Sequence, residues 1–184
     1  MKNFSKLTFL SFVCCAAMCS SQDEPTVISK EYESCCGTKP VEFSFEKKEI
    51  YMPNAFTPNK DGVNDYFFPV VNDVVTDVWG FAIFDTKDSM IYQKPHFFPK
   101  ADIKTYGWNG LDEDGKPYKG LFKYKMRLDD RYANKYILEG HACAIVCGPE
   151  SKMLVSKEGC YYPAQAGKSG NLDKSIANAD KGCF

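Results

Sequence analysis

Histidine is scarce in this chain, which has only His96 and His141 among its 184 residues. No serine or cysteine nucleophile motif accompanies them, so the sequence offers no visible machinery for hydrolysis. A long basic run is also missing, and 23 Lys and Arg nearly balance 24 Asp and Glu. These absences argue against an enzyme and against a nucleic-acid partner.

A hydrophobic run long enough to cross a membrane is missing as well. The main apolar run, residues 7–18, is shorter than the ~20 residues that a spanning helix needs. It follows a short segment with two lysines and precedes a polar segment, which is the layout of a secretory signal peptide. We therefore expect residues 1–18 to be a signal peptide, and the alternative is a buried N-terminal helix.

The segment Ala16-Ala-Met-Cys19 resembles a bacterial lipobox, in which the cysteine becomes the lipidated first residue of the mature protein. The polar segment that follows, residues 20–24, resembles the tether of surface lipoproteins in gliding bacteria. We predict an N-terminal lipid on Cys19, a polar tether over residues 19–40, and a location at the outer membrane or cell surface. The alternative is ordinary cleavage just after Cys19, which would release a secreted protein.

Six cysteines follow Cys19, and we expect them to form disulfide bonds because their number is even and the chain is expected to be exported. Cys143 and Cys147 lie on one expected strand, where they would be about 13 Å apart, whereas a disulfide needs Cα atoms within roughly 7 Å. Each should therefore bond to a flanking segment. A zinc site with His141 is the alternative, but its spacing matches no standard zinc pattern. The six candidates are Cys35, Cys36, Cys143, Cys147, Cys160 and Cys183.

Residues 41–147 carry the apolar patterns of β-strands. Apolar and charged residues alternate over 120–128, and two apolar runs at 78–84 and 90–92 flank a polar loop, as in a hairpin. No segment shows a sustained helical period, so we expect an all-β domain of about seven strands, packed as a sandwich. Residues 148–184 lack alternation and are expected to form a cysteine-containing extension.

The loop Asn59-Lys-Asp61-Gly-Val-Asn64-Asp65 spaces oxygen-bearing side chains around a glycine. This arrangement lets a short loop wrap a hard cation, so we predict that Asn59, Asp61 and Asp65 bind calcium, with Asn64 as a further candidate. The alternative is an Asx-rich turn whose side chains bond to their own backbone and need no ion.

Three segments resemble a known family: Pro53-Asn-Ala-Phe-Thr-Pro-Asn-Lys-Asp-Gly-Val-Asn-Asp65, Phe81-Ala-Ile-Phe-Asp85, and Gly107-Trp-Asn-Gly-Leu-Asp-Glu-Asp-Gly-Lys-Pro117. Together they are similar to the gliding-motility-associated C-terminal domain, also called the type B sorting domain of type IX secretion, over roughly residues 49–147. The resemblance implies an immunoglobulin-like antiparallel β-sandwich, an envelope or surface location, and no catalysis.

A sorting domain of this family usually ends a longer cargo protein, whereas here we expect only a tether before the domain and an extension after it. We therefore expect a non-catalytic binding or accessory module of a gliding or type IX secretion complex, with a protein partner. The alternatives are a secreted protein that uses the domain as a sorting signal, and a carbohydrate-binding adhesin. Trp108 is expected to lie in the core and not to serve as a sugar platform.

Overall fold

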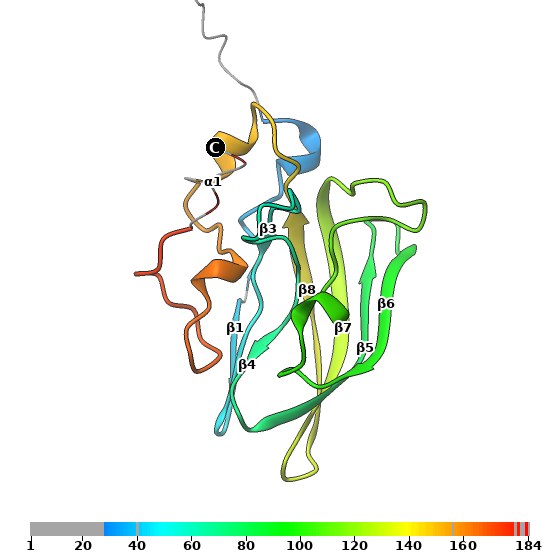
Figure 1. Ribbon diagram of the computed structural model, residues 1–184, viewed down its shortest axis with the longest axis vertical. Helices are drawn as coiled ribbons and strands as arrows, with labels where there is room; N and C mark the ends of the chain where they lie inside the picture. The colour runs from blue at the N-terminus through cyan, green and yellow to red at the C-terminus, as the bar shows by residue number, and fades with distance from the viewer. Residues whose placement is uncertain (1–27, 40, 156, 179, 181–182, 184) are drawn as a thin grey trace, which may run out of the picture.

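The computed structural model describes residues 28–39, 41–155, 157–178, 180 and 183. The described chain is mainly β, with one short α-helix and three single 3₁₀ turns (Figure 1). Its strands form two sheets, one with the order β1-β2-β4 and one with the order β3-β8-β7-β5-β6. The strands are β1 (Glu42–Phe45), β2 (Lys48–Tyr51), β3 (Ala55–Phe56), β4 (Val70–Val71), β5 (Val75–Phe84), β6 (Met90–Phe97), β7 (Gly120–Asp130) and β8 (Lys135–Ala144). The helical elements are η1 (Lys30–Tyr32), η2 (Ile103–Thr105), α1 (Ser151–Val155) and η3 (Pro163–Gln165).

Strand β7 shows why the larger sheet forms where the alternating pattern predicts it. Its even-numbered apolar side chains, from Phe122 to Leu128, are buried, while Lys123, Lys125 and Arg127 point to the other face. The strand pairs antiparallel with β5 on one side and with β8 on the other. One face of this sheet is therefore wet, as the alternation of apolar and charged residues predicts.

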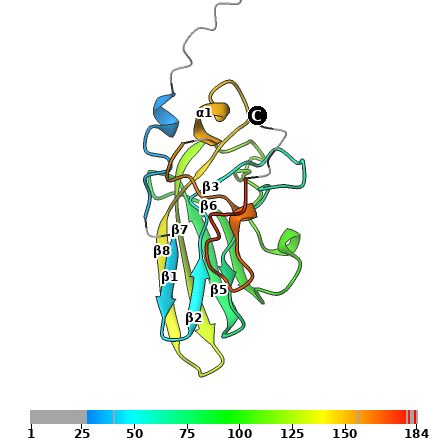
Figure 2. The same ribbon diagram turned by 90° about the vertical axis from the view of Figure 1, so that its left-hand side faces the viewer.

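The two sheets share one hydrophobic core, and Figure 2 shows β1 and β2 lying in front of β8 and β7. Ile50 of β2 packs in the same buried cluster as the inward side chains of β5, β7 and β8. Aromatic rings fill its centre: Phe122 lies edge-on to Phe67 and to Trp108, with centroids 4.8 and 4.9 Å apart. Trp108 is fully buried and its Nε1 donates to the Leu111 carbonyl at 2.7 Å, so its expected place in the core is confirmed.

The short strand β3 departs from the expected antiparallel pattern. It pairs parallel with β8, with Ala55 opposite Cys143. After Pro53 ends the β2 segment, the chain crosses to the free edge of β8, where the carbonyls of Asn54 and Phe56 accept from the N–H groups of Cys143 and Ile145, each at 2.9 Å. The strand expected to carry both Cys143 and Cys147 ends at Ala144, and Cys147 lies beyond it.

Three disulfides attach the flanking segments to this β-structure. They join Cys35 to Cys143, Cys36 to Cys160 and Cys147 to Cys183, with Cα atoms 5.7, 4.3 and 4.7 Å apart. The cysteines at 143 and 147 thus reach flanking segments and not each other, as the sequence predicts. Tyr32, from the segment expected to be a tether, is buried with Cys35, Cys36, Cys143 and Cys160 in a second hydrophobic cluster.

The C-terminal extension, drawn orange to red in Figures 1 and 2, lies along the smaller sheet. The Tyr51 hydroxyl of β2 donates to the Tyr162 carbonyl at 2.8 Å. Farther along, the N–H of Leu172 donates to a carboxylate oxygen of Glu42 in β1, also at 2.8 Å. The described part of the extension is therefore packed onto the β-structure by hydrogen bonds as well as by disulfides.

Candidate functional site

The loop of residues 57–65 is held by hydrogen bonds between its own side chains and backbone. Asn59 Oδ1 accepts from the N–H of Asp61 at 3.0 Å, and Asp61 Oδ1 accepts from the N–H of Val63 at 2.8 Å. The two carboxylate oxygens of Asp65 accept from the N–H groups of Lys60 and Gly62. These are Asx-type turns, and they fold the loop so that its polar side chains converge.

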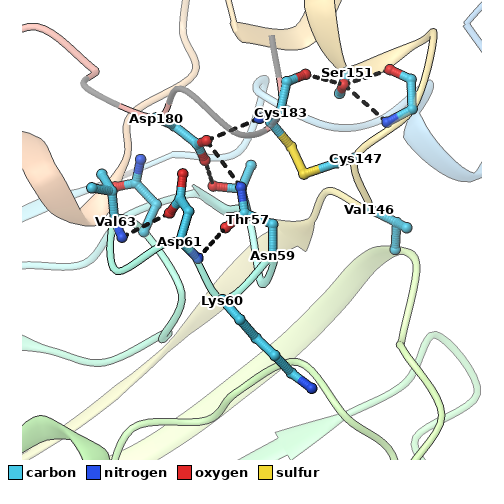
Figure 3. Close-up of a disulfide and its surroundings, with 12 residues drawn as sticks. Thr57, Asn59, Lys60, Asp61, Val63, Val146, Cys147, Ser151, Asp180 and Cys183 are labelled. Atoms are coloured by element: carbon cyan, nitrogen blue, oxygen red, sulfur yellow. Dashed lines mark hydrogen bonds between the residues drawn. A yellow bond between two sulfur atoms is a disulfide. The ribbon is translucent and has the colours of Figure 1, made fainter.

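Asp180 of the C-terminal extension reaches into this loop (Figure 3). It accepts a hydrogen bond from the Thr57 hydroxyl, another from Asn59 Nδ2 at 3.1 Å, and a third from the N–H of Cys183 at 3.2 Å. Burial raises the pKa of the Asp180 carboxyl, and the nearby negative charge of Asp61 raises it further, while the Thr57 hydrogen bond lowers it. Two carboxylates are therefore brought together from segments far apart in sequence.

The buried side chain of Asn64 points toward the extension and not toward the centre of the loop. Its Nδ2 donates to Asn178 Oδ1 at 2.6 Å, and its Oδ1 accepts from the N–H of Ala164 at 2.8 Å. Both of its polar atoms are thus engaged by the extension. Asn64, the further calcium candidate, thus fastens the extension to the loop, and its part in a calcium site stays a prediction.

The hydrogen bonds of the loop account for its shape without a cation. Both oxygens of Asp65 and one oxygen of Asp61 already accept backbone N–H groups, as the Asx-turn alternative requires. Among the described residues, no group of three or more His, Cys, Asp or Glu side chains lies close enough to hold a metal ion. Calcium at Asn59, Asp61 and Asp65 therefore stays a prediction, which the repulsion between Asp61 and Asp180 favours.

The disulfides remove the zinc alternative. A cysteine binds zinc as a free thiolate, and both Cys143 and Cys147 are bonded to other cysteines. His141 lies exposed on β8 opposite Lys123 of β7, and all six cysteines of the described residues are in disulfides.

The predicted lipid anchor at Cys19 and the predicted signal peptide, residues 1–18, lie outside the described residues. Within the part of the chain that the structure describes, no helix has the length and apolar character needed to span a membrane.

On the outer face of the larger sheet, Trp79 packs against side chains of the two neighbouring strands. Trp79 of β5 is 38% exposed, and its ring lies 4.0 Å from the His96 ring of β6 and 5.1 Å from the Arg127 guanidinium of β7. Because β6 and β7 flank β5 on opposite sides, His96 and Arg127 approach the indole from the two neighbouring strands.

The two longest segments of the family resemblance lie next to each other. Phe67, which follows the 53–65 segment, exchanges two backbone hydrogen bonds with Trp108 of the 107–117 segment, at 2.8 and 3.0 Å. The loops on either side of this pair therefore meet at one end of the molecule.

No protein-family model matches the chain, and no curated protein is similar to it. The resemblance to the gliding-motility-associated C-terminal domain thus rests on the three sequence segments themselves.

Proposed function

We propose that this chain is a non-catalytic binding or accessory module of the bacterial envelope, associated with a gliding or type IX secretion complex and anchored to the outer membrane through a lipid on Cys19. Its two-sheet domain is taken to be an immunoglobulin-like β-sandwich. The three segments of the family resemblance support this assignment, and the folded core around Trp108 is compatible with it.

The observation that carries the proposal is the attachment of the extension to the domain. The segment after β8 is held by Cys36–Cys160 and Cys147–Cys183, and Asp180 is buried against the 57–65 loop. A segment bound in this way is a fixed part of the surface of the domain, and we propose that it takes part in binding. The sorting-signal alternative gives it no task, because there the domain only directs a cargo.

The adhesin alternative would need an exposed aromatic platform. The described outer face of the larger sheet offers Trp79, but its ring packs against His96 and Arg127, which leaves only part of the side chain exposed. We therefore propose a protein, and not a sugar, as the partner.

A structural calcium ion belongs to the same proposal, with Asn59, Asp61 and Asp65 as ligands. Support comes from the like charges of Asp61 and Asp180, whose repulsion a bound cation would relieve. The ion would stabilise the loop and the extension that closes on it, and would take no part in any reaction.

Co-purification from detergent-solubilised membranes tests the proposed function. We expect the tagged chain to bring down one or a few envelope proteins in constant proportion, because a lipid-anchored module without a partner would have no role in a complex. Recovery of the chain alone, even after chemical cross-linking in intact cells, would contradict the proposal.

A further inference from the structure

An open groove of about 900 Å³ lies where the two family-like loops meet the extension. One wall is the 58–66 loop, another is the segment from Ile103 to Pro117, and Pro163 and Ala164 of the extension close one side. The disulfide-held extension therefore contributes to the groove, although most of the lining comes from the two loops. It has the size of known ligand sites, which run from roughly 300 to 1,000 Å³.

The walls of the groove are largely apolar and partly exposed. Tyr66 and Phe68 are neither fully buried nor fully exposed, and the same holds for Ile103 and Leu111. Pro117 is exposed at the rim. Apolar area left in contact with water in a concave surface is area that a ligand can cover with a favourable free-energy change.

The described side chains that line the groove carry a small net positive charge, from two lysines and one carboxylate. Lys60 lines one wall and Lys104 lines another, both are exposed, and neither has an ion-pair partner within 4.0 Å among the described residues. Asp65 is the one carboxylate that lines the groove, and both of its oxygens accept backbone N–H groups. Nearby, Asp61, Asp102 and Asp112 accept backbone N–H groups within their own turns, Asp114 lies 3.5 Å from the Lys116 ammonium, and Glu113 is exposed outside the lining. An anion is therefore the ligand that complements this surface.

We propose that the groove binds an extended acidic peptide segment of a partner protein, with an apolar side chain between the walls and carboxylates at Lys60 and Lys104. This inference rests on the proposed function as a binding module and names the class of its partner. The groove is open along one side, which suits a chain that enters and leaves it. The two ammonium groups come from different walls, so they suit a ligand with charges on both sides of an apolar group.

Selection from a library of random displayed peptides on the immobilised, disulfide-bonded protein tests the proposal. We expect the selected peptides to combine acidic with apolar residues and to bind more weakly at high salt. The double variant Lys60→Glu, Lys104→Glu should weaken their binding by about tenfold or more, since it replaces attraction by repulsion at both walls. The matched control is Lys87→Glu, Lys135→Glu, which makes the same change of charge at two exposed lysines outside the groove.

Three outcomes would overturn the proposal: selected peptides without acidic residues, equal loss of binding in both double variants, or no selected peptide at all. If anilinonaphthalene sulfonate binds the folded protein through Lys60 and Lys104 while no peptide does, the groove takes small organic anions instead. Co-purification separates this inference from the proposed function. An envelope partner that the Lys60→Glu, Lys104→Glu protein still retains would leave the module in place and exclude the groove as its docking site.

Discussion

At the scale of single residues, Lys48 is the most constrained charge in the described chain. Its side chain is 1% exposed, and its Nζ lies 3.1 Å from an oxygen of Asp130, whose side chain is equally buried. The pair joins β2 of the smaller sheet to the end of β7 in the larger sheet. Hydrogen bonding to Tyr136, then to Glu46 and Asp130, raises the pKa of Lys48 against the opposing effect of burial. Both residues are therefore charged at neutral pH.

Lys48→Met should lower the melting temperature at neutral pH by several degrees, because it leaves the Asp130 carboxylate buried without its cation. The double variant Lys48→Met, Asp130→Asn should recover most of the loss, since it removes the charge as well. Thermal unfolding followed by circular dichroism measures both. A double variant less stable than the single one would show that the pair stabilises the fold in its own right.

The pH dependence of this ion pair has a definite sign. Burial alone would raise the pKa of Asp130, but hydrogen bonds from Asn134 and Lys48 lower it to about 2, from the ordinary 3.8. A lowered pKa in the folded state means that the stability from this group is complete above pH 3.8 and is lost as the pH falls toward 2. The difference in stability between the wild type and Lys48→Met should therefore shrink over that range, which acid titrations of the two unfolding curves would reveal.

The predicted calcium site also depends on single side chains. If Asn59, Asp61 and Asp65 hold the ion, calcium should raise the melting temperature of the wild type relative to a chelator. Asp61→Asn should abolish this response, because it keeps the acceptor for the Val63 N–H and removes the charge. Asp85→Asn is the control, since Asp85 forms a similar turn with Lys87 outside the loop. Identical wild-type curves in calcium and chelator would leave the loop as a plain Asx turn.

At the scale of the strands, Gly140 of β8 leaves space for a side chain of the neighbouring strand β7. A Cβ atom at this position would lie 2.7 Å from Cζ of the buried Tyr124 ring on β7. The two residues are directly paired, so the glycine makes room for the tyrosine.

Gly140→Ala should therefore destabilise the protein by about 1–3 kcal/mol, the usual cost of overpacking a core. Gly148→Ala is the matched control, because a Cβ there has no neighbour within 4 Å. Urea unfolding of both variants gives the comparison. Equal stabilities would mean that the Tyr124 ring moves aside without cost.

Local patterns explain which strands the sequence predicts. β7 follows an alternation that is complete within its own residues, and the β5–β6 hairpin is framed by the polar turn around Asp85. β3 has only two residues, too few for any period, and its partner Cys143 lies far along the chain. The pairing depends on backbone hydrogen bonds between residues far apart in sequence, so no local sequence pattern predicts it.

The same distinction holds for the candidate site. Asn59, Asp61 and Asp65 occur in one short loop, and their spacing alone predicts that they converge. Asp180 lies in a tail without a period, and the Cys147–Cys183 bond and the hydrogen bonds of Asn64 hold that tail at the loop. Because Asp180 lies three residues before Cys183, its position near the loop could be predicted once the Cys147–Cys183 pairing is known.

At the scale of the whole molecule, covalent bonds decide whether the flanking segments stay in place. Removing the Cys147–Cys183 bond by a double serine replacement should cost about 2–4 kcal/mol, the usual range for a disulfide. It should also free Asp180 from the loop and weaken any calcium response. The two effects can be read from one set of melting curves. A variant that keeps its full stability and calcium response would show that hydrogen bonds alone hold the extension.

The location of the molecule depends on its other end. Cys19→Ser should move the protein from the membrane fraction to the soluble fraction, because loss of the acyl chains removes most of its membrane affinity. Incorporation of labelled palmitate into the wild type, and none into the variant, is the companion measurement. Unchanged fractionation would contradict lipid anchoring at this residue.

The neighbouring cysteines 35 and 36 also determine where mechanical tension runs. A pull between residue 28 and residue 183 passes along the chain to Cys35, across to Cys143, along residues 143–147, and across to Cys183. This covalent path bypasses every strand from β1 to β7, because residues 36–142 form a closed loop beside it. Load applied through both flanking segments can therefore be carried without stretching β1 to β7, and only the end of β8 lies on its path.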